Sequence, residues 1–98
     1  MSPLPSITNN VAESRFEAGT AHGTAMLRYV QRGDVIDLMH TVVPQAAEGN
    51  GVGSALAHAA LEHARAKGLK VVPSCPFVHR YVTKHREFAD LLAQPAAD

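Results

Sequence analysis

The residues with the clearest chemical potential are three glycines in the stretch "EGNGVGSALAHAALEHARAKG", which runs from Glu48 to Gly68. Gly49, Gly51 and Gly53 alternate with other residues directly before a long pattern of helical periodicity. An ordered glycine costs conformational entropy, so a cluster indicates a backbone that turns tightly or lies close to a ligand. The free N–H groups at a helix N-terminus bind phosphate. The stretch therefore predicts a phosphate-binding loop; the simpler alternative is an ordinary turn before a helix.

Two familiar phosphate loops do not fit this stretch. The P-loop requires a lysine directly after its last glycine, and Ser54 follows Gly53 here. The dinucleotide-binding pattern G-x-G-x-x-G does not match the spacing of Gly49, Gly51 and Gly53, and it follows parallel strands. A different kind of loop is indicated.

Two further side chains are candidates for acid–base or nucleophilic chemistry. Cys75 precedes Pro76 at the expected start of a second helix, where the helix N-terminus lowers the pKa of a thiol. It is a candidate base, proton shuttle or nucleophile, and the alternative is a small buried residue. His40 lies shortly before the glycines and is a candidate general base, or else a core histidine. The other histidines considered fall in pairs five or six residues apart, so no metal site is expected: His58 and His63, His79 and His85.

The elements that position these residues begin with short strands. The turns "AGTAHG" and "RGD" separate three segments of strand length, residues 14–18, 24–31 and 35–43, which predict an antiparallel meander. In the third segment Ile36, Leu38 and His40 share one face, and both faces are largely apolar, so we expect that strand to be covered on both sides.

A helix is expected at residues 51–67, closed by Gly68. A fourth strand at residues 69–74 follows this crossover, so it should run parallel to the third. A second helix begins at Pro76 and a last amphipathic turn follows. Together these elements predict an α+β fold.

Composition restricts the classes of partner. The 98 residues suffice for one domain, expected at residues 11–93, with a flexible lead-in at residues 1–10 and a frayed tail at residues 94–98. Nine basic and nine acidic residues give a net charge of zero, which argues against nucleic-acid binding. The single cysteine excludes an internal disulfide, and we expect a cytoplasmic protein without a signal peptide or membrane helix.

The loop "EGNGVGSAL" resembles the acetyl-CoA loop of the GNAT N-acetyltransferase superfamily, whose usual form is R/Q-x-x-G-x-G/A. Gly51 and Gly53 match its last two fixed positions, and Glu48 stands where the superfamily has Arg or Gln. The segments "HTVVP" and "ALEHARAKGLKVVPSCPFV", followed by Tyr81, resemble a subgroup of minimal single-domain members. The resemblance covers residues 15–92.

This resemblance implies a three-layer α/β arrangement that uses acetyl-CoA as co-substrate and needs no metal. The third and fourth strands would splay apart to admit the pantetheine arm, which pairs with backbone at Thr41, Val42 and Val43. The diphosphate would bind the N–H groups of the loop, which consists of Glu48, Gly49, Asn50, Gly51, Val52, Gly53 and Ser54.

The resemblance also implies direct attack of an amine on the thioester carbonyl, helped by a backbone oxyanion donor, a base and an acid. Many members place the acid, a tyrosine, in the second helix; Tyr81 is near that position, but Val82 occupies the expected register and packing is the alternative role. The carboxylate of Glu48 would repel the diphosphate. The sequence thus favours an N-acetyltransferase acting on a protein lysine, an N-terminus or a small amine. The alternatives are a CoA-binding module without turnover and a purely structural domain, and the oligomeric state is left open.

Overall fold

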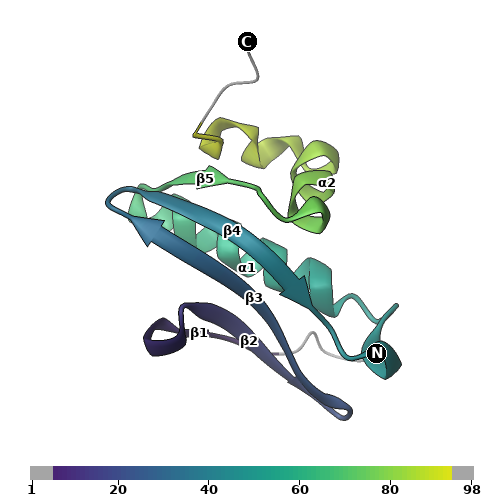
Figure 1. Cartoon of the computed structure of the whole chain (residues 1–98). Coiled ribbons are helices and arrows are strands. Elements are labelled where there is room, and N and C mark those ends of the chain that lie inside the picture. Colours follow the sequence, from purple (N-terminus) through teal and green to yellow (C-terminus); the bar gives the residue numbers. More distant parts are fainter. Residues whose placement is uncertain (1–5, 94–98) are drawn as a thin grey trace.

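The chain forms one five-stranded mixed sheet with its strands in sequence order (Figure 1). The computed structural model describes residues 6–93. Strands β1 to β4 are antiparallel neighbours, and β5 runs parallel to β4. The strands are β1 Ile7–Asn10, β2 Arg15–Thr20, β3 Gly23–Arg32, β4 Val35–Val42 and β5 Lys70–Val72. The predicted meander, crossover and parallel strand are confirmed, and with them the α+β class.

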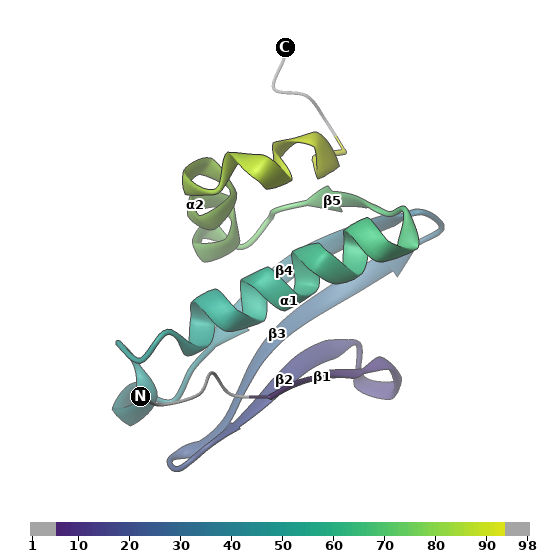
Figure 2. The ribbon, with the colours of Figure 1, turned by 180° about the vertical axis from the view of Figure 1, so that it is seen from behind.

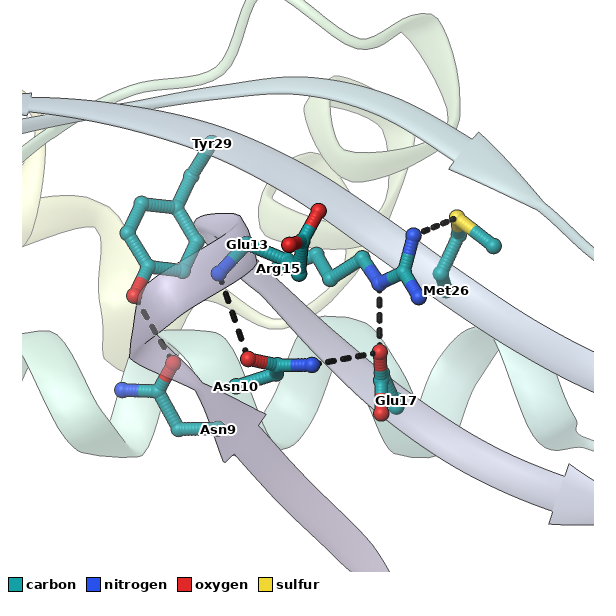
Figure 3. Close-up of polar contacts among 7 residues, drawn as sticks. All are labelled: Asn9, Asn10, Glu13, Arg15, Glu17, Met26 and Tyr29. Carbon is teal, nitrogen blue, oxygen red and sulfur yellow. Dashed lines mark hydrogen bonds and ion pairs between the residues drawn. The ribbon is translucent and has the colours of Figure 1, made fainter.

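The expectation of a flexible lead-in at residues 1–10 is wrong for Ile7–Asn10, which form strand β1. Ile7–Asn10 pair with β2, and a 3₁₀ turn at Val11–Glu13 leads into that strand. Two polar contacts fix β1 in place: the Tyr29 hydroxyl donates to Asn9 Oδ1 (2.7 Å), and Asn10 Nδ2 donates to Glu17 Oε2 (3.0 Å) (Figure 3). The strand was missed because its four residues include two asparagines, which are rare in strands. Residues 1–5 and the expected tail at residues 94–98 lie outside the described residues.

Helix α1, Val52–Lys67, connects β4 to β5 in the chain and lies across one face of the sheet (Figure 2). Gly68 ends it in a left-handed conformation (φ 69°), and its N–H donates to carbonyl oxygens of the last turn, as predicted. Its buried side chains include three alanines, which let the helix lie close to the sheet: Val52, Leu56, Ala57, Ala60, Leu61 and Ala64.

Helix α2, Pro76–Lys84, and a 3₁₀ helix, η3 Arg86–Leu91, follow β5 and contact α1. The Arg65 side chain of α1 donates to the Asp90 carboxylate (3.2 Å) and to the Glu87 carbonyl oxygen (2.6 Å) of η3. These contacts fix η3 against α1. A short 3₁₀ turn, η2 Gln45–Ala47, lies between β4 and the glycine loop.

The core lies between the sheet and α1. Its fully buried large side chains come from every layer: Leu27, Ile36, Leu38, Leu56, Leu61, Val71, Val78 and Phe88. The opposite face of β3 and β4 is open in Figure 1, and Val30, Met39 and Val42 are 38%, 44% and 41% exposed. The expectation that residues 35–43 are covered on both sides is therefore wrong.

A β-bulge in β4 decides which side chains face α1. Leu38 pairs with Tyr29 and His40 pairs with Arg28, so Met39 has no partner in β3. One extra residue reverses the alternation of side chains. His40 therefore lies on the open face and is exposed, and the prediction that it shares a face with Ile36 and Leu38 is wrong.

Candidate active site

Strands β4 and β5 separate after three paired residues. Val35–Asp37 pair with Lys70–Val72, and one further backbone hydrogen bond follows, from the Cys75 N–H to the Leu38 carbonyl oxygen (2.9 Å). Beyond this point no backbone hydrogen bond joins β4 to the chain after β5 within the described residues. The remainder of β4 therefore borders a wedge-shaped opening with its apex at Leu38 and Cys75.

A cavity of about 400 Å³ lies in this opening. Most of its wall consists of residues that the sequence predicted as cofactor contacts: Thr41, Val43, Glu48, Gly49, Gly51, Val52, Gly53 and Ser54. Val42 and Asn50 do not line it, and Val42 lies on the open face opposite Met26. Ala47 and Phe77 complete the lining and were not predicted. The cavity thus joins the unpaired edge of β4 to the start of α1.

The glycine loop gives this cavity a wall of backbone. Gly49 and Gly51 have φ of 87° and 80°, a left-handed conformation that strains any other residue. Gly51 is the N-cap of α1, and no side chain caps the helix. The first N–H groups of this 16-residue helix have no acceptor within it, and they carry the positive end of its dipole. The loop can therefore bind an anion through its backbone.

Gly53 is required by close packing. It lies in the first turn of α1 opposite Phe77 of α2, and a Cβ at this position would lie 3.1 Å from Cζ of the Phe77 ring. The lack of a side chain at Gly53 therefore lets the aromatic ring close the cavity on the α2 side.

Cys75 is the N-cap of α2, as predicted, and it lies behind the cavity wall. Its side chain is buried, and Sγ lies 3.2 Å from Oγ1 of Thr41, which does line the cavity. Burial raises the pKa of the thiol, but hydrogen bonds with the Thr41 hydroxyl and with backbone N–H groups, two of them at the start of α2, outweigh it. The pKa therefore lies below its ordinary value.

Tyr81 and His40 lie away from the cavity. The Tyr81 ring stacks on the His85 ring (centroids 3.9 Å apart), and its hydroxyl lies 3.4 Å from His58 Nδ1 on α1. Burial, followed by the charges of Glu87 and Glu62, raises the pKa of the Tyr81 phenol. The packing role weighed for Tyr81 agrees with these contacts. Within residues 6–93 no three His, Cys, Asp or Glu side chains gather where they would hold a metal ion.

Comparison with known proteins agrees with this geometry. The model of the GCN5-related N-acetyl-transferase family matches residues 15–91. The chain belongs to this family. An NMR solution structure of a GCN5-like protein from Staphylococcus aureus superimposes with a TM-score of 0.70 and 32% identity, over 94% of this chain and 90% of that one.

Among curated relatives, the protein NATD1 of Gallus gallus and that of Mus musculus are each 37% identical over 65 residues. The match covers 65% of this chain and 59% of each relative, so the chain spans less than two thirds of their length. The family match covers the glycine loop, the wedge and Cys75. No helix in the described part of the chain has both the length and the apolar character to span a membrane.

Three site features escaped sequence reasoning for identifiable reasons. The bulge at Met39 has no glycine or proline to mark it, yet it turns Thr41 toward α1. Phe77 directly follows Pro76 and lies in the first turn of α2. Its place in the cavity wall could have been predicted from Pro76, because the N-termini of α1 and α2 both lie at the wedge. Asp37 is the last β4 residue paired with β5, and its Oδ1 is buried without a hydrogen-bond partner in the described residues.

Proposed function

We propose that this GNAT-family protein binds acetyl-CoA in the wedge and transfers the acetyl group to an amine. The observation that carries the proposal is the cavity itself, whose wall joins an unpaired strand edge to an uncapped helix N-terminus. A volume of about 400 Å³ lies within the range of small-molecule sites. It suits the pantetheine arm and diphosphate of CoA.

Each part of the cavity then has a task. Backbone N–H groups from Gly49 to Ser54 bind the diphosphate, because a helix start supplies both donors and a favourable dipole. The pantetheine amides pair with the free edge of β4 at Thr41 to Val43. The thioester lies toward the apex of the wedge, where a backbone N–H of β4 stabilises the oxyanion.

The amine attacks the thioester carbonyl directly, and Cys75 supplies or receives protons. Cys75 is only 3% exposed and does not line the cavity, which favours a proton-transfer role over that of an acetylated nucleophile. His40 and Tyr81, the other candidates, lie outside the cavity lining. We place the reaction in the cytoplasm, where Cys75 stays reduced.

The acceptor is a primary amine: a protein lysine, an N-terminus or a small amine. The sheet face that carries Val30, Met39 and Val42 is open, and an acceptor that approaches over it reaches the wedge from the side opposite α1. An open approach of this kind accommodates a side chain of another protein as readily as a small molecule.

One observation favours a second candidate function, a CoA-binding module without turnover. The single charged side chain among the residues that line the cavity is Glu48, an acid. It lowers the affinity for a diphosphate by electrostatic repulsion, although it leaves the backbone donors in place.

Calorimetric titration with CoA, acetyl-CoA and dephospho-CoA tests the binding step, and thiol release from acetyl-CoA in the presence of polyamines or lysine peptides tests turnover. The enzyme is expected to bind all three and to release CoA only when an amine is present. Binding without amine-dependent release favours the module. If none of the three ligands binds or raises the melting temperature, both candidates are wrong.

A further inference from the structure

We propose that the Thr41 hydroxyl accepts the proton of the attacking amine, and that Cys75 acts through Thr41 as the group that stores this proton. The proposal rests on the function proposed above. The Thr41 side chain thereby has a catalytic role, whereas the sequence resemblance implied only that the Thr41 backbone pairs with pantetheine.

Thr41 is directed at the cavity by the bulge in β4. It pairs with Leu27, which is fully buried on the α1 face, so its side chain lies on that face. Among the lining residues contributed by β4, the turn after it and α2, only Thr41 has a polar side chain; the others are Val43, Ala47 and Phe77. The other polar side chains that line the cavity, Glu48 and Ser54, belong to the glycine loop, so the Thr41 hydroxyl is the proton acceptor that lies beside Cys75.

Cys75 is the second residue of this proton relay. Its Sγ lies 3.2 Å from Thr41 Oγ1, and its backbone N–H is bonded to the Leu38 carbonyl oxygen at the apex of the wedge. The N–H groups of Phe77 and Val78 in α2 also stabilise the thiolate, and no ionisable side chain contributes to the lowered pKa. The thiolate is thus stabilised by neutral groups and separated from the cavity by Thr41.

The protons and electrons balance in this arrangement. The amine nitrogen bonds to the thioester carbon, and the nitrogen of the tetrahedral intermediate gives a proton to Thr41 Oγ1 while the Thr41 proton moves to the Cys75 thiolate. The carbon–sulfur bond then breaks and leaves its electron pair on the CoA sulfur. Cys75 returns the proton through Thr41 to the CoA thiolate. The products are the amide and CoA, and both residues regain their starting state.

Four variants test the two roles: Thr41→Val, Thr41→Ser, Cys75→Ser and Cys75→Ala. Thr83→Val is the matched control, because Thr83 is exposed and its hydroxyl donates to the His79 carbonyl oxygen within α2. Valine suits a strand, so Thr41→Val should fold. We expect Thr41→Val to lower kcat about 100-fold or more with little change in acetyl-CoA affinity, since general base catalysis contributes roughly 10²–10⁴-fold. Thr41→Ser keeps a hydroxyl and should restore most of the kcat that Thr41→Val loses, whereas Thr83→Val should stay close to the parent protein.

Cys75→Ala should match the loss in kcat of Thr41→Val. Cys75→Ser keeps a hydroxyl but not a thiolate, so its activity should require a higher pH than the parent protein. The kcat of Cys75→Ala and the pH dependence of Cys75→Ser together distinguish proton storage by Cys75 from a packing role.

A readout that needs no turnover separates this proposal from the proposed function. The ultraviolet absorbance of the Cys75 thiolate, titrated in the full chain, should shift to higher pH in Thr41→Val and remain unchanged in Thr83→Val. That shift is expected even if acetyl-CoA does not bind. The proposal is overturned if Thr41→Val leaves the titration or kcat unchanged, if it weakens acetyl-CoA binding as much as it slows turnover, or if mass spectrometry finds Cys75 acetylated during turnover.

Discussion

The packing of Gly53 against Phe77 gives the most quantitative prediction. In Gly53→Ala the new Cβ would lie 3.1 Å from Phe77 Cζ, and 3.4 and 3.5 Å from two other ring carbons. The ring must therefore shift by a few tenths of an ångström. Phe77 is half-buried and lines the cavity, so the space available to it is the cavity itself.

Two effects oppose each other in Gly53→Ala. Alanine favours a helix by about 0.8–1 kcal/mol over glycine, whereas overpacking costs roughly 1–3 kcal/mol. In a Phe77→Leu background the clash is relieved and only the helical gain remains. The two substitutions should therefore show a coupling free energy of about 1–3 kcal/mol.

Thermal unfolding of the four proteins in this cycle measures the coupling, since 1 kcal/mol corresponds to roughly 4–8 °C in Tm for a chain of this size. Gly51→Ala is the matched control: its φ of 80° strains alanine, but its Cβ meets open space, so its cost of about 1–2 kcal/mol should be the same in both backgrounds. Calorimetry should also show CoA binding about tenfold weaker in Gly53→Ala. An equal change in Tm on Gly53→Ala with Phe77 and with Leu at position 77 would refute the contact between Gly53 and the Phe77 ring.

Three further predictions address charge and pH. Glu48→Gln should tighten CoA binding about three- to tenfold at low salt, with a smaller gain at high salt, as measured by calorimetry; an unchanged affinity would place the diphosphate elsewhere. Asp37→Val should raise the free energy of unfolding by about 1–3 kcal/mol in urea titrations, because it removes a buried carboxylate oxygen that has no hydrogen-bond partner among the described residues. A lower free energy of unfolding would show that this oxygen does have a partner. Burial, with Lys67 nearby, lowers the pKa of His63, so the unfolded state binds more protons and stability falls as the pH drops below about 6.5. His63→Gln should lose less stability between pH 7 and pH 5.5, and an identical loss would contradict the assignment.

The sequence predicted the elements that local chemistry defines. Gly68 ended the crossover helix, Pro76 began the second helix, and the turn signals placed the edges of β3 and β4 within one or two residues. Glycines before a helix likewise predicted the loop, since a positive φ is a local property of the backbone.

The remaining features depend on contacts between distant residues. The bulge at Met39 arises from pairing with β3, and it moved His40 to the open face and Thr41 to the cavity. Strand β1 is held by Tyr29, which lies 20 residues after its partner Asn9, and by Glu17 of the neighbouring strand. The neighbourhood of Tyr81, with His58 and His85 around it, is set by how α2 packs on α1. Periodicity along one segment cannot show such contacts.

The central claim is that backbone N–H groups of the glycine loop and the free edge of β4 bind CoA together. Backbone amide NMR spectra of the full chain, recorded during titration with CoA, test it most directly. Saturable shifts should concentrate at Gly49 to Ser54 and at Thr41 to Val43, and leave β1 and β2 unchanged. Absence of saturable shifts, or shifts confined to other elements, would contradict the claim.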